Sequence, residues 1–156
     1  METPEFSISD SEIKNITFGK NIKIVKPCNI YGAKFGNDIF VGPFCEIQSE
    51  VTIGDRTRIQ SHSFICSLVD IGADCFIGHG VVFINDKFSE GGPARGDKNL
   101  WKKTRVGNFV SIGSNSTILP VNIVSNVVIG AGSVVTKNIE IPGVYAGNPT
   151  KLVRSF

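Results

Sequence analysis

Large apolar residues recur at every sixth position along most of the chain. The run is unbroken from Phe35 to Phe83. It extends backward to Phe18 with one five-residue step before Phe35, and it resumes from Val106 to Ile141 with another before Ile123. Its members are Phe18, Ile24, Ile30, Phe35, Val41, Ile47, Ile53, Ile59, Ile65, Ile71, Ile77, Phe83, Val106, Ile112, Ile118, Ile123, Ile129, Val135 and Ile141. A period of six matches neither an α-helix nor a plain β-strand, and it indicates short strands separated by regular corners.

Two further columns share this period. Glycine directly follows the apolar residue at Gly19, Gly36, Gly42, Gly54, Gly72, Gly78, Gly107, Gly113 and Gly130. A small or β-branched residue stands four places after it at Cys28, Cys45, Val51, Thr57, Ser63, Val69, Cys75, Val81, Val110, Ser116, Val127 and Ser133. Glycine permits backbone angles that other residues avoid, so we expect tight corners at these glycines. One large and one small inward column would fill a narrow prism-shaped core.

These columns predict an all-β fold, a parallel β-helix built from hexapeptide repeats. Three hexads would close one coil, and coils would stack at about 4.8 Å. We expect about six coils in a single domain over residues 1–156, with an N-terminal cap at 1–15, a long loop at 84–105 and a tail at 142–156.

Composition narrows the function classes. A net charge of +2 argues against a protein that binds nucleic acid through bulk charge. No apolar run is long enough for a membrane helix, and the acidic first residues do not resemble a secretory signal. The four cysteines, Cys28, Cys45, Cys66 and Cys75, fit neither a disulfide scaffold nor a zinc motif. We therefore expect a cytoplasmic protein that holds no metal, since two histidines are also too few for a zinc site.

Chemistry is expected where the repeat breaks. The segment 84–105 carries six basic and three acidic residues together with Phe88 and Trp101. Regular scaffolds usually extrude such loops for binding or catalysis. Its composition, including Arg95, suits an anionic ligand with a planar base, while a solvated loop with incidental charge is the alternative.

Three residues beside this break are candidate catalytic residues. Asn85 and Asp86 open the loop directly after the inward Phe83, where Asn-Asp is also ordinary turn chemistry. His79 lies at a corner just before the loop. Histidine is a common general base in enzymes, so His79 is a candidate general base or a structural histidine.

The last hexads have a different character. Small residues at Ala131 and Gly132 would expose backbone N–H and C=O groups to a ligand alongside the coil. Lys137, Lys151 and Arg154 are candidates for contacting phosphates, or they are solvated bases on a C-terminal cap.

The whole repeat, followed by IGAGSVVTKNI and PGVYAGNPTKLVR, resembles the hexapeptide-repeat acyltransferases that use acetyl-CoA. The segment IGHGVVFINDKF, the loop and VGNFVSIGSNSTILPV resemble more narrowly the N-acetyltransferases of nucleotide-linked amino sugars. Those acting on dTDP-linked 3-amino-3,6-dideoxyhexoses are the most similar, and UDP-linked sugars are the alternative. Such enzymes serve the biosynthesis of surface glycans such as lipopolysaccharide or S-layer glycan.

The resemblance implies a left-handed β-helix and a homotrimer with active sites between subunits. It implies that acetyl-CoA contacts Gly113, Ser114, Ala131 and Gly132, with its phosphates near Lys137, Lys151 and Arg154. Asn85 and Asp86 match residues that hold the sugar and its reacting amine, so the loop residues Phe88, Arg95 and Trp101 would contact the acceptor. Relatives often carry an acid eighteen residues before the asparagine, where this chain has Ser67.

Three readings of the function stay open. The first is direct acetyl transfer to an amine, with Asp86, His79 or the departing thiolate taking the proton. The second is O-acetylation of a hydroxyl, which needs a stronger base and would make His79 indispensable. The third is a non-catalytic structural β-helix subunit, which would need neither the loop nor the Asn-Asp pair.

Overall fold

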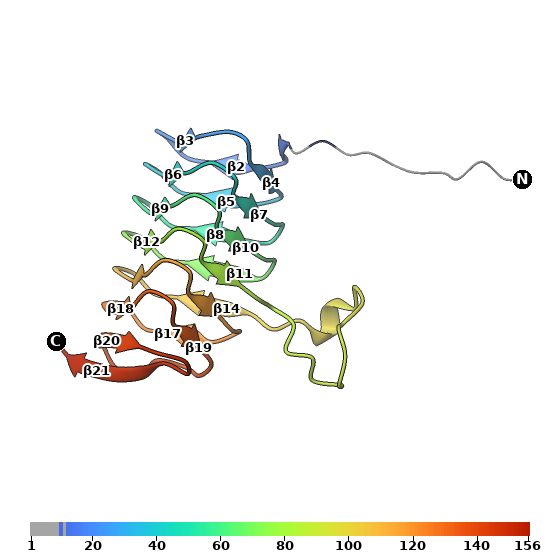
Figure 1. The fold of residues 1–156 in the computed structure, drawn as a ribbon. Coiled ribbons are helices and arrows are strands. Elements are labelled where there is room, and N and C mark those ends of the chain that lie inside the picture. The colour runs from blue at the N-terminus through green and yellow to red at the C-terminus, as the bar shows by residue number, and fades with distance from the viewer. Residues whose placement is uncertain (1–9, 11) are drawn as a thin grey trace, which may run out of the picture.

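Short parallel strands wind into a prism with three faces (Figure 1). The structure, a computed structural model, describes residue 10 and residues 12–156. The predicted left-handed parallel β-helix is confirmed, with about seven turns rather than six. The described residues contain no α-helix, and one short 3₁₀ helix, η1 (Lys98–Leu100), lies outside the prism.

Each face is a sheet with one strand per coil. Sheet A runs through β1 (Ile13–Lys14), β4 (Asn29–Tyr31), β7 (Glu46–Ile47), β10 (Phe64–Ile65), β13 (Val82–Phe83), β16 (Thr117–Ile118) and β19 (Val134–Val135). Sheet B runs through β2 (Thr17–Phe18), β5 (Lys34–Phe35), β8 (Thr52–Ile53), β11 (Val69–Ile71), β14 (Thr104–Val106) and β17 (Asn122–Ile123). Sheet C runs through β3 (Lys23–Ile24), β6 (Phe40–Val41), β9 (Arg58–Ile59), β12 (Phe76–Ile77), β15 (Ser111–Ile112), β18 (Val127–Ile129), β20 (Gly143–Ala146) and β21 (Lys151–Ser155).

The core is built from the two predicted columns. From Ile30 to Val135 every large residue of the register is buried, and so is every member of the small column. Equivalent residues of successive coils lie directly beside each other. Ile47, for example, pairs with Ile30 in the preceding coil and with Ile65 in the following coil. This stacking of identical positions explains why a period of six in the sequence becomes a continuous apolar core.

The predicted register holds at Phe18, which pairs with Phe35 but is not buried, and it is wrong at Ile141. Phe18 is 60% exposed, because β2 is the terminal strand of sheet B and only one neighbouring coil covers it. Ile141 is 57% exposed, and Ile139 takes the inward place by bridging to Ile123. The step after Val135 is therefore four residues, because the last coil tightens before the chain enters β20.

The prediction that the glycine column supplies the unusual backbone angles of the corners is wrong. Within the described residues, left-handed backbone angles fall two positions after these glycines, as at Asp38, Arg56 and Asp74. The glycines are needed instead for close approach between coils. A Cβ on Gly113 would lie 2.4 Å from the backbone nitrogen of Ala131, well inside van der Waals contact. Glycine at this column thus lets adjacent coils stack at the spacing of a parallel sheet.

The segments outside the repeat also differ from the predicted boundaries. Parallel pairing begins at Ile13, inside the expected cap, and nothing is described of residues 1–9 and 11. The inserted loop spans 84–103, since Thr104 and Arg105 belong to β14. The tail forms an antiparallel hairpin of β20 and β21 that closes the end of sheet C (Figure 1).

Candidate functional site

The candidate site residues lie along two of the prism's three edges. We call the corner from sheet C to sheet A the His79 edge; it comprises 43–44, 61–62, 79–80, 114–115 and 131–132. We call the corner from sheet A to sheet B the loop edge; it comprises 48–50, 66–68, 84–103, 119–121 and 136–138. Strand β13 separates the two edges, so His79 and Asp86 lie at opposite ends of one face, roughly 20 Å apart along an extended chain.

His79 is exposed and is oriented by the coil below it. Its Nδ1 lies 2.9 Å from the Ser61 hydroxyl, one coil earlier. That hydrogen bond leaves Nε2 directed away from the pair and available to a ligand. Below it on the same edge, the exposed Phe44 ring stacks on His62 at 4.9 Å between centroids.

The four glycine and small residues predicted to contact acetyl-CoA continue the His79 edge. The Asn115 N–H donates to the His79 carbonyl at 2.8 Å, and the Gly132 N–H donates to the Ser114 carbonyl at 2.8 Å. Ala131 and Gly132 are exposed, and a Cβ at Gly132 would meet nothing within 4 Å. This edge therefore offers an open strip of small residues and backbone running from His79 toward the C-terminus.

The loop edge holds Asn85 in the predicted position above Ser67. The Asn85 side-chain amide donates from Nδ2 to the Ser67 carbonyl at 3.1 Å. The Lys102 N–H donates to the Asn85 carbonyl at 2.8 Å, which closes the root of the loop. Ser67 is buried and its hydroxyl lies 3.4 Å from that of Ser49, so it supports the root rather than facing solvent. Among the described residues, nothing donates to Oδ1 of Asn85, which is free to accept from a ligand.

Asp86 uses both carboxylate oxygens to hold the loop backbone. Oδ1 accepts from the Phe88 N–H at 2.8 Å and Oδ2 accepts from the Ala94 N–H at 2.6 Å. A carboxylate has about four acceptor positions, so an additional donor from a ligand can still be bound.

The three predicted ligand-binding residues of the loop differ in exposure. Phe88 is 59% exposed and Arg95 is exposed, whereas Trp101 is half-buried. Lys98 Nζ lies 6.0 Å from the centre of the Trp101 ring and 3.1 Å from Oε1 of Glu50. Lys98 therefore ties the loop to the prism through Glu50, while Phe88 and Arg95 are available to a ligand.

The three predicted phosphate-binding residues do not form one cluster. Lys137 follows β19 on the loop edge. Lys151 is the first residue of β21 and pairs with Ala146. Because Ala146 packs against Gly130, Lys151 lies near the His79 edge. Arg154 lies farther along β21, over the Phe156 ring at 5.4 Å. All three are exposed.

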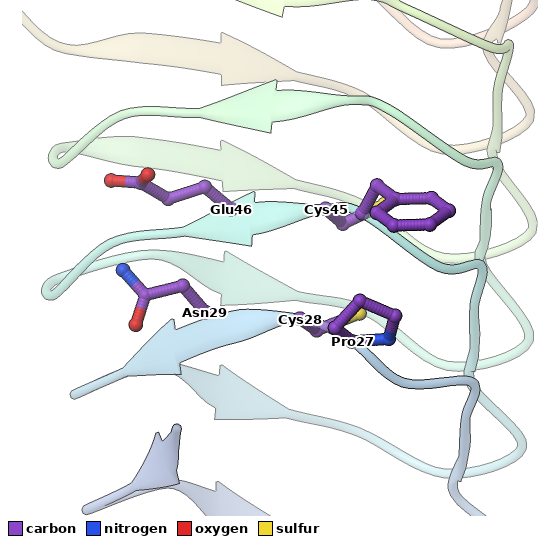
Figure 2. A pocket seen from close by; sticks show the side chains of 6 residues that line it. Pro27, Cys28, Asn29, Cys45 and Glu46 are labelled. Carbon is purple, nitrogen blue, oxygen red and sulfur yellow. The ribbon is translucent and has the colours of Figure 1, made fainter. Parts of the chain in front are cut away.

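Among the hollows along these edges, two lie close to candidate residues. One of about 260 Å³ lies beside Phe44 and is lined by Pro27, Cys28, Asn29, Phe44, Cys45 and Glu46. Figure 2 shows Asn29 and Glu46 stacked on β4 and β7 at its side. The other, of about 330 Å³, lies below the loop and is lined by Gly32, Lys34, Ser49, Glu50, Val51, Thr52, Leu68, Asp70 and Lys103. Both were missed from the sequence, because their shape depends on how neighbouring coils and the loop pack.

The cysteines are inert core residues. All four are buried and unpaired. Burial raises the pKa of Cys45 to about 11 and that of Cys66 to about 12, and it also raises the pKa of Cys75. Because the thiolate is the reactive form, these thiols are poor nucleophiles at neutral pH.

Within residues 10 and 12–156, no three His, Cys, Asp or Glu side chains are grouped so as to hold a metal ion. In that same part of the chain, no helix has the length and apolar character needed to cross a bilayer.

Comparison with known proteins places the repeat. Residues 103–137 match the family model described as the hexapeptide repeat of succinyl-transferase. The chain is a hexapeptide-repeat protein. Among curated proteins it is 28% identical over 149 residues to the bifunctional protein GlmU of Streptococcus uberis, covering 94% of this chain and 30% of GlmU. The chain spans about a fifth to a third of the length of such relatives.

Two solved structures are informative. AntD, an N-acyltransferase from Bacillus cereus, was solved as an aspartate-to-alanine variant in complex with dTDP and coenzyme A. AntD is 26% identical to this chain, and the two structures superpose with a TM-score of 0.79. The aligned region covers 89% of this chain and 83% of AntD. Perosamine N-acetyltransferase from Caulobacter crescentus was solved with CoA and GDP-perosamine. It is 17% identical with a TM-score of 0.62, covering 90% of this chain and 54% of that one. At that identity, the second likeness shows the fold alone.

Proposed function

We propose that this chain is an acetyl-CoA-dependent N-acetyltransferase that acts on the amino group of a nucleotide-linked amino sugar. The observation that most strongly supports this function is the Asn85–Asp86 pair, which lies at the root of a loop inserted into a hexapeptide-repeat prism. The likeness to AntD, which was solved with dTDP and coenzyme A, supports this pairing of ligands. A dTDP-linked 3-amino-3,6-dideoxyhexose is the favoured acceptor, and surface-glycan biosynthesis is the setting that such a sugar would serve.

The active site is shared between copies in a homotrimer. Within one copy, the small-residue strip and the loop root lie on different edges, separated by the whole width of sheet A. If the His79 edge of one copy faces the loop edge of the next, the thioester of acetyl-CoA meets the sugar amine in the groove. A closed ring of three copies then contains three equivalent sites.

The transfer is direct. The neutral amine attacks the thioester carbonyl carbon, the carbon–sulfur bond breaks, and an amide and a free thiol result. Asn85 Oδ1 and Asp86 orient the amine, which places it in line with the carbonyl. Backbone N–H groups on the small-residue strip stabilise the developing oxyanion. The departing thiolate is a sufficient final acceptor for the proton of the amine, so no covalent enzyme intermediate is required.

Lys137, Lys151 and Arg154 complete the cofactor site. All three are exposed bases near the C-terminal end of the prism, which is where the strip from Gly113 to Gly132 leads. Lys137 lies on the loop edge, so it would meet the cofactor of the adjoining site rather than the one bound along its own copy's strip. Their role is to neutralise the phosphates of acetyl-CoA.

The function is tested by incubating the chain with acetyl-CoA and a panel of dTDP-, UDP- and GDP-linked amino sugars. Mass spectrometry should detect acetylation of a dTDP-linked amino sugar, with the matching hydroxyl sugar unmodified. If acetyl-CoA neither binds nor is consumed with any member of the panel, the chain is a structural subunit instead.

His79 distinguishes amine from hydroxyl acceptors. We expect His79→Ala to lower kcat/KM for an amino sugar by no more than roughly tenfold, because the amine is already nucleophilic. A hydroxyl acceptor would lose about 10²–10⁴-fold, the usual contribution of a general base. Steady-state kinetics decide between them, with Ser61→Ala as a control that removes only the hydrogen bond to Nδ1. A variant that is inactive toward amines would overturn the amine reading.

A further inference from the structure

We propose that Asp86, in addition to orienting the amine, is the latch of the inserted loop: it holds the segment 86–94 in a preformed turn and so presents Phe88 to the nucleotide of the acceptor. The identity of the ligand rests on the proposed function, whereas the latch itself rests on the loop geometry alone.

The hydrogen bonds of Asp86 span the turn. Its two oxygens accept from backbone N–H groups at either end, Phe88 at 2.8 Å and Ala94 at 2.6 Å. Between them, the Gly91 N–H donates to the Phe88 carbonyl at 2.9 Å. Ala94 is buried, whereas residues 87–91 are exposed. A charged acceptor bound to two N–H donors forms stronger contacts than a neutral one, so the carboxylate closes this turn more firmly than an amide would.

Phe88 shares its left-handed backbone angle and exposed ring with Phe44 and Phe109, but it alone of the three has its N–H bound by the Asp86 carboxylate. Its φ is 52°, in the left-handed region that aromatic residues seldom occupy. Its ring is 59% exposed, although an aromatic ring of this size usually buries most of its area. The Asp86 oxygen bound to the Phe88 N–H offsets the cost of that conformation. A planar ring kept in solvent on a braced turn suits stacking against a nucleobase.

The rest of the loop is held by independent contacts. Asp97 caps η1 by accepting from the Asn99 N–H at 3.0 Å. Lys98 pairs with Glu50, and the Lys102 N–H donates to Asn85. Loss of the latch should therefore loosen residues 86–94 and leave the remainder of the loop and the prism in place.

Limited proteolysis of the full chain tests the latch without any ligand. In Asp86→Asn the side-chain NH₂ group must face one backbone N–H, donor against donor, so that contact is lost. Trypsin should then cut after Lys87 at least about tenfold faster, because native-state cleavage follows the population of the open segment. The melting temperature should stay close to that of the wild type, since the loop lies outside the core. Glu90→Gln is the matched control, with the same loss of charge in the same turn, and should cleave like the wild type.

A double-mutant cycle tests the link from Asp86 to Phe88. The Kd for dTDP and for UDP is measured by calorimetry for the wild type, Asp86→Asn, Phe88→Ala and the double variant. If Asp86 acts through Phe88, Asp86→Asn weakens binding about tenfold in the wild type and less than about threefold once Phe88 is absent. The Kd for acetyl-CoA should not change in any variant.

Several outcomes would overturn the proposal. If Asp86→Asn is cleaved at the same rate as the wild type, or if Glu90→Gln accelerates cleavage equally, Asp86 does not hold the turn closed. If the effects of the two substitutions on the Kd are additive, or if neither nucleotide binds the wild type, Asp86 does not act on nucleotide binding through Phe88. Absence of acetyl transfer with every sugar would overturn the proposed function and leave the proteolysis result standing.

Discussion

Replacing Ile59 by aspartate is expected to abolish folding. Ile59 is 0% exposed and sits in β9, between Val41 and Ile77 of the adjacent coils. A buried carboxylate without a partner costs several kcal/mol, against the ~5–15 kcal/mol that stabilises a typical domain. Circular dichroism and yield of soluble protein measure the effect.

The control for Ile59 is its neighbour in the same strand. Arg58 points outward, and Arg58→Asp places the same carboxylate in water while losing the contact of Arg58 with the Phe40 ring at 4.8 Å. It should fold with a melting temperature a few degrees lower at most. A soluble Ile59→Asp protein that melts like the wild type would show that the inward register is wrong.

Asp86→Asn is expected to lower kcat/KM for the amino sugar by about 10²–10⁴-fold, the range typical of a group that acts directly on the transferred proton or its donor. The substitution removes both the charge that orients the amine and one of the two hydrogen bonds that shape the loop. Acetyl-CoA binding should survive, because the strip from Gly113 to Gly132 lies on the other edge.

Steady-state kinetics with the preferred sugar and calorimetry with acetyl-CoA measure this pair of effects. Asn85→Asp serves as the companion variant, since it keeps an acceptor oxygen but removes the Nδ2 donor to the Ser67 carbonyl. Wild-type activity in Asp86→Asn, together with an inactive His79→Ala, would exclude the amine acceptor and favour a hydroxyl one.

The fold could be predicted because equivalent positions in successive coils have the same kind of neighbours and are buried in the same way. Ile47, Ile65 and their equivalents meet identical neighbours above and below, so the spacing alone places them in the core. Phe18 keeps the predicted register but stays exposed, because its coil lacks a neighbour on one side. The register itself failed at Ile141, where the last coil changes its step. The prediction also misassigned the glycines, since a close approach such as that of Gly113 to Ala131 depends on the stacking of distant residues.

The site could be predicted only in part. The eighteen-residue spacing placed Asn85 above Ser67, and the hydrogen bond between them follows from coil length. The contacts of Asp86 with Ala94 and of Lys98 with Glu50 depend on the path of an irregular loop, which no period encodes. The separation of His79 from Asp86 by one prism face is implied by their spacing, yet only the strand assignments made it evident.

We propose that the His79 edge of one copy and the loop edge of the next form each active site. This arrangement is tested most directly by co-expressing two inactive variants with different tags and isolating mixed trimers. Ala131→Trp fills the cofactor strip on the His79 edge, and Asp86→Asn disables the loop root. In every isolated mixed trimer, whichever variant is in the majority, one of the three interfaces joins two intact edges, so activity should return to about a third of the wild-type value. Mixed trimers as inactive as either parent, or an active monomer in sedimentation, would contradict the claim.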